Sequence, residues 1–394
     1  MKKKWWIVIV LILLELVVCG GILLSLWAGR TAFEGVHFFY HADAQVEETV
    51  EETFVVDGPT ILDLETAAGN VTVTGGGTGN EVQVIARLSL WGEDEEDARR
   101  QLEVKTTQEG NRITVRVVRP EWNYAFPYTR ASRVDFEVRV PTETSLRLVS
   151  ASGDLVASRV TGTVELETNS GDVWAEGLDG LVSAQSSSGD ITLTSLNNAG
   201  DLEVKTVSGD LMLRDVIADS LTARSSSGRV QVEGVALDGG LDLENTSGDV
   251  TAVIVRATSC RLASVSGDLT LDGGSGPLNL RTYAGAIEVR NGTEAELMLG
   301  TTSGEIRFSG SLDTQEGHRV ESTSGDVRLV LPADTAFDLD IKTDSGDIQT
   351  DFAVTMTDFD RKHVTGEVNG GGPLLQINTS SGDIALERMT SESD

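Results

Sequence analysis

A tripeptide, Ser-Gly-Asp, recurs along most of the second half of this chain and limits the folds that it can adopt. Aligned on the glycine, the motif or a close variant occurs twelve times from Gly153 to Gly382, at spacings of 18 to 21 residues and one longer gap of 36. A near-constant period of this length is typical of repeat proteins, in which one repeat cannot bury its apolar face alone.

Within each repeat, apolar residues alternate as they do in a strand with one buried face. Every repeat has Val, Ile or Leu two residues after the glycine and an aliphatic residue five before it. Three before it, every repeat has Ser, Thr or Asn, which also points inward and can hydrogen-bond its counterparts in neighbouring repeats. The sequence therefore predicts an all-β, parallel β-solenoid of about 12–13 coils over 141–388, with a glycine corner between the two strands of each coil.

The segments around these repeats are predicted to serve the solenoid. Residues 53–140 should form a first coil, over 53–75, and a small β-rich cap with a short acidic helix, because an uncovered strand edge promotes aggregation. The interruption at 351–372 is expected to form a side loop and 389–394 a frayed tail. Residues 30–52 are expected to be a polar spacer.

The N-terminus predicts a membrane anchor. Basic residues 1–4 precede an apolar run, 5–29, that is long enough to span a bilayer and contains one charge. Tryptophans at both ends suit the two membrane interfaces, and the lysines should stay in the cytoplasm. We expect a single-pass cell-membrane protein that contacts lipid through this helix and holds its C-terminal domain outside the cytoplasm. The anchor residues are Lys2, Lys3, Lys4, Trp5, Trp6, Glu15 and Trp27.

This segment leaves two questions open. The anchor could be cleaved as a signal peptide, or Cys19 could be a lipoprotein site, although Val18 is larger than such a site prefers. Glu15 lies near the middle of the span, where it could pair with another membrane helix or be a tolerated protonated acid.

Composition and motifs argue against several functions. With 31 basic and 62 acidic residues, the net charge of −31 repels phosphate backbones, so no nucleic-acid partner is expected. Two cysteines provide neither a disulfide framework nor zinc-ligand spacing, and Cys260 falls in an inward column. The sequence has no nucleophile elbow, P-loop or zinc-protease motif, so we expect no enzyme and no cofactor. A polysaccharide-active β-helix enzyme is a minor alternative.

The aspartates that follow the corner glycines have two readings. Stacked coils would align them in a column, in which each carboxylate could accept hydrogen bonds from turn N–H groups. Alternatively, the column could bind calcium, although one carboxylate per corner falls short of the six to eight oxygens that calcium takes. We favour the structural reading and expect no metal site. The corner pairs are Gly153 and Asp154, Gly171 and Asp172, Gly189 and Asp190, Gly209 and Asp210, Gly248 and Asp249, Gly267 and Asp268, Gly325 and Asp326, Gly346 and Asp347, and Gly382 and Asp383.

An aromatic cluster in the cap is a second candidate site. In "PEWNYAFPYTR" the aromatic residues fall at alternate positions, so one face of an extended segment could bind a sugar or a peptide. The favoured alternative is that they close the apolar end of the solenoid. The cluster comprises Trp122, Tyr124, Phe126 and Tyr128.

Three stretches resemble a bacterial adhesin-type family of unknown function with serial Ser-Gly-Asp turns. They are "EETFVVDGPTILDLETAAGNVTVTG", "VRVPTETSLRLVSASGDL" and "TGEVNGGGPLLQINTSSGDIAL". The resemblance covers roughly residues 50–388 and implies surface attachment or envelope signalling, with no catalytic motif to transfer. Two functions are therefore expected: a surface scaffold that binds a protein or an envelope glycan, or an envelope-stress sensor that couples to a membrane partner.

Overall fold

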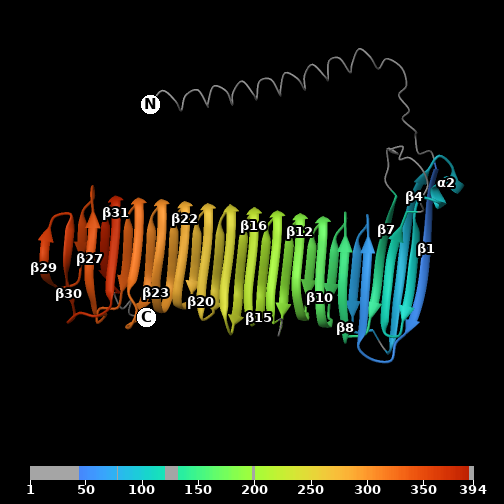
Figure 1. Ribbon diagram of the computed structural model, residues 1–394, viewed down its shortest axis with the longest axis horizontal. Helices are drawn as coiled ribbons and strands as arrows, with labels where there is room; N and C mark the ends of the chain where they lie inside the picture. Colours follow the sequence, from blue (N-terminus) through green and yellow to red (C-terminus); the bar gives the residue numbers. More distant parts are fainter. Residues whose placement is uncertain (1–43, 78, 120–131, 198–199, 390–394) are drawn as a thin grey trace, which may run out of the picture.

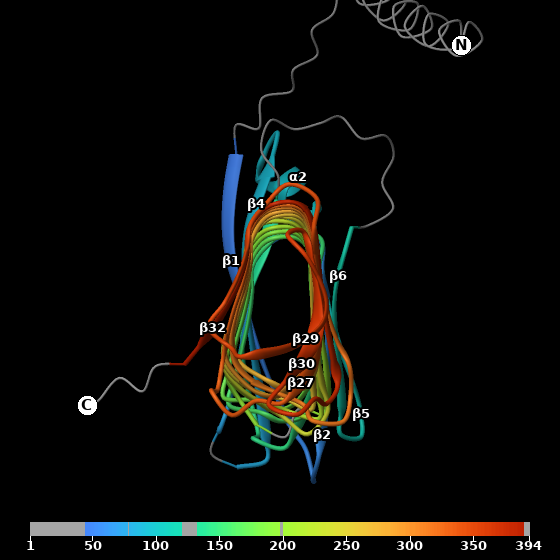
Figure 2. The same ribbon diagram turned by 90° about the vertical axis from the view of Figure 1, so that its left-hand side faces the viewer.

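Residues 44–77, 79–119, 132–197 and 200–389 are described by the structure, a computed structural model. Their strands lie across the long axis and are stacked side by side, from the blue N-terminal strands at one end to the red C-terminal strands at the other (Figure 1). Seen along that axis, the stack is flattened, and two layers of strands face each other across a narrow interior (Figure 2). We name these layers A and B.

Each coil contributes one strand to each layer. Layer A contains, in order along the stack, β5 (Glu103–Glu109), β6 (Arg112–Val118), β2 (Thr60–Thr66), β8 (Thr144–Ser150), β10 (Thr161–Ser170), β12 (Asp179–Ser188), β14 (Asp201–Ser208), β16 (Ser220–Ser227), β18 (Gly240–Ser247), β20 (Ser259–Ser266), β22 (Ser275–Ala284), the second part of β23 (Ile287–Ser303), β25 (His318–Ser324), β31 (Leu374–Ser381), β27 (Phe337–Thr343), β30 (His363–Val368) and β29 (Val354–Asp360). Layer B contains β1 (Ala44–Val55), β4 (Glu81–Gly92), β7 (Arg133–Val140), β3 (Val71–Gly75), β9 (Leu155–Ser158), β11 (Val173–Glu176), β13 (Ile191–Leu196), β15 (Leu211–Ala218), β17 (Val230–Leu237), β19 (Val250–Arg256), β21 (Leu269–Gly273), the first part of β23, β24 (Ile306–Leu312), β26 (Val327–Leu331), β32 (Ile384–Arg388) and β28 (Ile348–Thr350). A helix, α2 (Glu95–Arg99), lies beside β4.

Neighbouring coils pair in the register that the glycine alignment predicts. Leu166 lies opposite Ala184 in layer A, and Val173 lies opposite Ile191 in layer B. The aliphatic residues two after and five before the corner glycine are buried, except for half-buried Ile348. The predicted all-β parallel β-solenoid is therefore confirmed.

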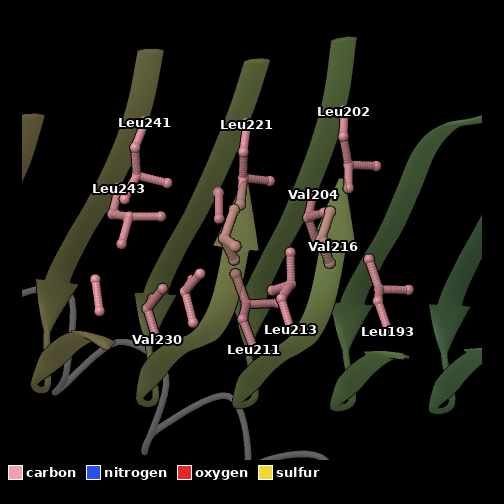
Figure 3. Close-up of a cluster of buried hydrophobic side chains, with 14 of the residues drawn as sticks. Leu193, Leu202, Val204, Leu211, Leu213, Val216, Leu221, Val230, Leu241 and Leu243 are labelled. Atoms are coloured by element: carbon pink, nitrogen blue, oxygen red, sulfur yellow. The ribbon is translucent and has the colours of Figure 1, made fainter. Parts of the chain in front are cut away.

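The interior is a continuous apolar core between the two layers. Because side chains alternate along a strand, the inward residues of layer A meet those of layer B while their neighbours face solvent. Each fully buried aliphatic side chain stabilises the fold by about 1.5–3 kcal/mol. Figure 3 shows one section of this core, with Leu202, Val204, Leu221, Leu241 and Leu243 of layer A and Leu193, Leu211, Leu213, Val216 and Val230 of layer B.

The corner glycines are required because neighbouring coils approach closely at this edge. Gly209 has a φ of +153°, and a Cβ atom there would lie 2.1 Å from the carbonyl oxygen of Gly189 in the preceding coil. Gly285 has no such φ, yet its Cβ would still lie 2.1 Å from the carbonyl oxygen of Gly267. The backbone contact alone therefore excludes a side chain, and the positive φ favours glycine further.

A second column of special residues, which sequence reasoning missed, lies six residues after the corner glycine. Several coils place a left-handed residue here, with φ of +56° at Ile254 and +67° at Gly234. Glycine or Asn at this position in other coils was the available signal, since these residues adopt left-handed φ most readily. The non-glycine members are Arg159, Ser195, Asp215, Ile254 and Asn291.

The solenoid departs from sequence order at its C-terminal end. Ten corner glycines from Gly153 to Gly325 follow one another in order and so delimit nine consecutive turns. The next coil in space is that of Gly382, because β31 and β32 pair with β25 and β26. The coil of Gly346 lies beyond it, with β27 and β28 paired to the far sides of β31 and β32. The last coil of the chain is thus inserted between two earlier coils.

The prediction of a side loop at 351–372 is wrong. This segment contains β29 and β30, which form an antiparallel hairpin, and β30 also pairs antiparallel with β27. Val354 and Met356 in β29 are separated by a polar residue, as are Val364, Gly366 and Val368 in β30, so both stretches have the alternation of strands. The exposed edge of β27 provides a partner for β30. The hairpin therefore extends layer A beyond the last coil.

The N-terminal end carries a cap of longer strands. The spacer predicted for 30–52 is wrong over 44–52, because β1 pairs antiparallel with β4 along its whole length. Val46 is buried and Val50 and Phe54 pack against the core, which accounts for this strand. Residues 1–43, including the predicted anchor, lie outside the described residues. Within the described ranges no helix is long and apolar enough to cross a membrane.

Candidate functional site: an axial trough on layer A

The corner aspartates form a ladder of hydrogen bonds along one edge of the solenoid. Asp172 Oδ1 accepts from the N–H of Asp190 (2.8 Å), and Asp190 Oδ1 accepts from the N–H of Asp210 (2.7 Å). Each carboxylate therefore bonds the backbone of the next coil, which offsets the repulsion between like charges one strand spacing apart. The same bond joins further coils, with acceptor and donor residues Asp154 and Asp172, Asp210 and Arg229, Asp249 and Asp268, Asp268 and Ala286, Asp326 and Asp383, and Asp383 and Asp347.

This ladder begins in the N-terminal cap. Asp135 Oδ1 accepts from the N–H of Asn70 (2.9 Å), and Asn70 Oδ1 accepts from the N–H of Asp154 (3.0 Å). A neutral amide oxygen thus performs the same role as a carboxylate. Among the described residues, no group of three or more His, Cys, Asp or Glu side chains is placed to hold a metal ion.

The hydroxyl column three residues before the glycine forms a second ladder inside the corner. Thr206 Oγ1 donates to the carbonyl oxygen of Gly189 (3.1 Å), and Thr282 Oγ1 donates to that of Gly267 (3.1 Å). Asn245 Nδ2 does the same with Gly228 (2.7 Å). These bonds satisfy carbonyl groups that face the neighbouring coil at a buried corner.

Two predicted sites cannot be placed. The anchor residues Lys2 to Trp27 and the aromatic residues Trp122 to Tyr128 lie outside the described residues. The segments that flank the aromatic stretch are β6 in layer A and β7 in layer B, at the capped end of the solenoid.

Two buried polar side chains have structural surroundings. Burial raises the pKa of the Cys260 thiol to about 12, so this group is an unreactive thiol at neutral pH. Burial lowers the pKa of His318, whose ring lies 3.1 Å from the carbonyl oxygen of Asp313 and accepts a 3.4 Å bond from the N–H of Leu297. A neutral ring held by two backbone groups fits a structural role.

Two neighbouring hollows form a trough on the outer face of layer A. We call it the axial trough. It follows the residues four, three and two positions before the corner glycine, where each strand bends toward the corner. One hollow of about 550 Å³ covers strands β10 to β20, and a second of about 580 Å³ covers β22 to β27. The two hollows lie end to end on adjacent strands, because Ala263 of the first pairs with Arg281 of the second.

In the first hollow, which we call the proximal half, arginine side chains form ion pairs with nearby carboxylates. Arg224 lies 2.9 Å from Glu244 and 3.4 Å from Asp242, and Arg261 lies 2.8 Å from Asp242 and close to Glu244. Hydrogen bonds from Arg261 and Arg224 lower the pKa of Glu244, and the bond to Glu244 raises the pKa of Arg224. Arg224 and Arg261 are thus held by carboxylates of neighbouring strands, and Lys205 pairs with Glu203 on its own strand.

The second hollow, the distal half, has a different charge pattern. Its lining contains three cations, Arg281, Arg319 and Lys342, and two carboxylates, Glu321 and Asp344. Arg319 pairs with Glu321 (2.6 Å), whereas Arg281 bonds the neutral amide of Asn279 (3.2 Å). Arg281 and Lys342 have no ion pair within the described part of the chain. In a protein of net charge −31, this hollow carries a local charge of +1, from three cations minus two carboxylates.

The rim of the trough supplies apolar contact area. Three side chains two positions before the corner glycine are more than half exposed, Val207 at 55%, Val265 at 54% and Tyr283 at 64%. The sequence analysis did not predict this trough. The apolar members of an otherwise Ser- and Thr-rich column were the available signal.

Comparison with known proteins is consistent with this architecture. The family profile described as "Toastrack DUF4097" matches residues 61–276 and 255–387. No curated protein matches the sequence.

Three crystal structures are similar over most of the chain. A candidate cell adhesion protein from Clostridium sporogenes is 8% identical, with a TM-score of 0.18, and the match covers 87% of this chain and 100% of that one. A candidate adhesin from Bacteroides fragilis is 13% identical, with a TM-score of 0.26 and coverage of 87% and 97%. A candidate adhesin from Parabacteroides distasonis is 10% identical, with a TM-score of 0.24 and coverage of 88% and 98%. These TM-scores are too low to support an argument.

Proposed function

This chain belongs to the Toastrack DUF4097 family, and we propose that it is a non-enzymatic surface scaffold that binds a linear polymer of the cell envelope along the axial trough. The proposal includes the membrane anchor at 5–29, which would contact lipid and hold the solenoid outside the cytoplasm.

The observation that carries this proposal is the length of the trough. It crosses β10, β12, β14, β16, β18, β20, β22, β23, β25, β31 and β27, which are eleven neighbouring strands. At about 4.8 Å per strand, ten spacings give roughly 48 Å. A hollow of this shape suits an extended chain that runs along the solenoid axis, and small-molecule pockets are shorter and more enclosed.

Recognition in the trough would rely on side chains. The strands beneath it are paired on both sides, so their backbone groups are already used and strand addition is not available. Hydroxyl and amide groups can bond a polar polymer, and the exposed side chains of Val207, Val265 and Tyr283 can contact its apolar faces.

The burial and ionisation of the potentially reactive side chains support a binding role over catalysis. The Cys260 thiol is buried with a raised pKa, and the His318 ring is buried and bonded to backbone groups. The Glu244 carboxylate of the proximal half is held in ion pairs with Arg224 and Arg261, which favours its charged form and so disfavours a proton-donor role.

The proposal can be tested by blocking the trough without disturbing the core. Ser226 lies exposed in the trough, two residues before Gly228, and Gln231 lies three residues after it on the outer face of layer B. We expect the full-length Ser226→Trp variant to lose binding to an array of bacterial envelope polysaccharides. The matched Gln231→Trp variant should bind as the wild type does, and circular dichroism should show the same Tm for both variants.

Wild-type binding by both variants would contradict the proposal, because the trough would then not be the contact surface. Binding that both substitutions reduce, at unchanged Tm, would place the ligand on a surface that includes both layers.

A further inference from the structure

The geometry points to an anionic polysaccharide as the polymer that occupies the trough, with its acidic groups held in the distal half. This inference rests on the proposed function and specifies the chemical class of the ligand. It follows from the position of three cations, the open space between them, and an exposed aromatic ring beside them.

The three cations are spaced evenly along the solenoid axis. Arg281 on β22 lies opposite Gly300 on β23, and Gly300 lies opposite Glu321 on β25, the strand that also carries Arg319. The next strand in the stack is β31, and β27, which carries Lys342, follows it. Successive cations are therefore two strands apart, which is roughly 10 Å at about 4.8 Å per strand. A polymer with regularly repeated acidic groups could contact Arg281 and Lys342, and Arg319 between them is already paired with Glu321.

Gly300 leaves the space that such a polymer needs. It is the position four residues before Gly304, where other coils have residues such as Arg224, Glu244 and Arg281. A Cβ atom at Gly300 would have no heavy atom within 4 Å, so the strand does not require glycine for packing. The missing side chain opens the floor of the distal half between Arg281 and Glu321.

The surroundings favour a sugar polymer over an acidic peptide. Tyr283 is 64% exposed on the strand that carries Arg281, and its ring can stack on the face of a sugar. Thr302, Thr323, Asn378 and Ser380 line the distal half and can bond hydroxyl groups. An extended peptide would instead gain most from backbone pairing with a free strand edge, which this part of layer A does not offer.

The charge of the remaining protein makes this hollow selective. At a net charge of −31 the solenoid repels a polyanion over most of its surface, so binding should occur only where cations are not already neutralised. In the proximal half, Lys205 pairs with Glu203, and Arg224 with Glu244. Arg281 and Lys342 of the distal half have no ion pair within the residues that the structure describes.

A pair of opposite charges at one position provides the sharpest test. We expect the full-length Gly300→Lys variant to bind polygalacturonate several-fold more tightly than the wild type, and the Gly300→Glu variant several-fold more weakly. A purely steric or structural effect would move both variants in the same direction. Binding is measured by isothermal titration or biolayer interferometry at low and physiological salt, with uncharged dextran as the neutral polymer.

A second pair of variants removes the cations themselves. Arg281→Gln with Lys342→Gln should weaken polygalacturonate binding by about tenfold. Arg290→Gln with Arg328→Gln removes the same charge from exposed positions on layer B and should change binding less than about twofold. Equal losses in the two double variants would overturn the inference, because binding would then follow net charge alone.

Other outcomes separate this inference from the proposed function. Dextran binding as strong as polygalacturonate binding, or tighter binding of poly-L-glutamate, would overturn the inference in favour of a neutral sugar or a peptide. If Ser226→Trp abolishes envelope-polymer binding while the Gly300 variants change nothing, the trough functions without the anionic ligand. If Ser226→Trp also has no effect, the proposed function fails as well.

Discussion

At the scale of single residues, close packing of neighbouring coils explains why glycine recurs at each corner. Neighbouring coils approach so closely there that a Cβ atom at each such glycine would overlap a carbonyl oxygen of the adjacent coil. The aspartate that follows then bonds the backbone of the next coil. A motif that looks chemical in sequence therefore has a packing and hydrogen-bonding role in the fold.

The first prediction concerns this contact. We expect Gly209→Ala to lower the free energy of unfolding by about 3 kcal/mol, because its Cβ would lie 2.1 Å from the oxygen of Gly189 and its φ is +153°. Gly300→Ala is the matched control, since it meets nothing within 4 Å, and it should change stability by less than about 1 kcal/mol. Urea denaturation measures both, and similar losses would show that glycine is needed for another reason.

A second residue is predicted to be strained. Ile254 is β-branched, 63% exposed and held at a φ of +56°, a conformation that costs L-residues about 1–2 kcal/mol. Replacing it with glycine, as the chain itself has at Gly234 and Gly273, should raise the free energy of unfolding by about 0.5–1 kcal/mol. Ile217 is 49% exposed in β15 without a positive φ, so Ile217→Gly should be destabilising. Destabilisation of comparable size by both changes would contradict the strain at Ile254.

The inward columns were predictable at this scale because burial depends on local alternation. Leu166, Val204 and Ile191 repeat at fixed distances from the glycine, and no distant partner changes which face they occupy. The left-handed column was not predicted, since glycine or Asn marks it in only some coils and Arg159, Ser195 and Ile254 occupy it in others.

At the scale of elements, the order of the coils at the C-terminus is the main departure from expectation. All coils carry the same columns, so Ile377 and Ile384 of the last coil can pair with their neighbours as well as Ile341 and Ile348 can. Local pattern therefore specifies a coil and its register but not which coil lies next to it. For the same reason β29 and β30 were expected to form a loop, because the sequence does not show that the edge of β27 is free to pair with them.

Removal of the inserted coil is predicted to disrupt the end of the stack. A chain that lacks residues 374–394 loses Leu375, Ile377, Ile384 and Leu386, all buried, and at about 1.5–3 kcal/mol each the loss is about 6–12 kcal/mol. We expect the amides of β25 to β28 to lose hydrogen-exchange protection, while strands near β10 keep theirs, since stability in a solenoid is a sum over neighbouring coils.

The control for this deletion is a chain that lacks only residues 390–394, which should exchange as the wild type does. Unchanged protection of β25 and β26 in the larger deletion would show that β27 and β28 close directly onto them.

At the scale of the whole molecule, the net charge of −31 affects stability and the candidate site together. The solenoid has two outer faces (Figure 2), and ion pairs such as Arg224 with Glu244 on layer A offset only part of the repulsion. Composition predicted the absence of a nucleic-acid partner on this ground. It did not predict the trough, because a concave surface requires knowing which strands are neighbours and where each one bends.

This charge predicts a stabilising effect of salt. Raising NaCl from about 10 to 150 mM shortens the Debye length from about 30 to 8 Å and should raise the Tm by a few degrees, because self-repulsion outweighs the exposed ion pairs. Choline chloride at the same ionic strength should raise the Tm by a similar amount. A lower Tm in salt would show that the ion pairs dominate, and a rise specific to calcium would revive a metal site at the aspartate column.

The inserted final coil has a consequence for how the protein is made. Its residues follow β25 to β28 in the sequence and are synthesised after them, yet they lie between two of these earlier coils. The N-terminal turns can assemble while the chain is still growing, whereas this end of the stack must wait until residues 374–388 have been synthesised. A chain that stops before residue 374 would leave the far edges of β25 and β26 without their partner strands, and such unpaired edges promote aggregation.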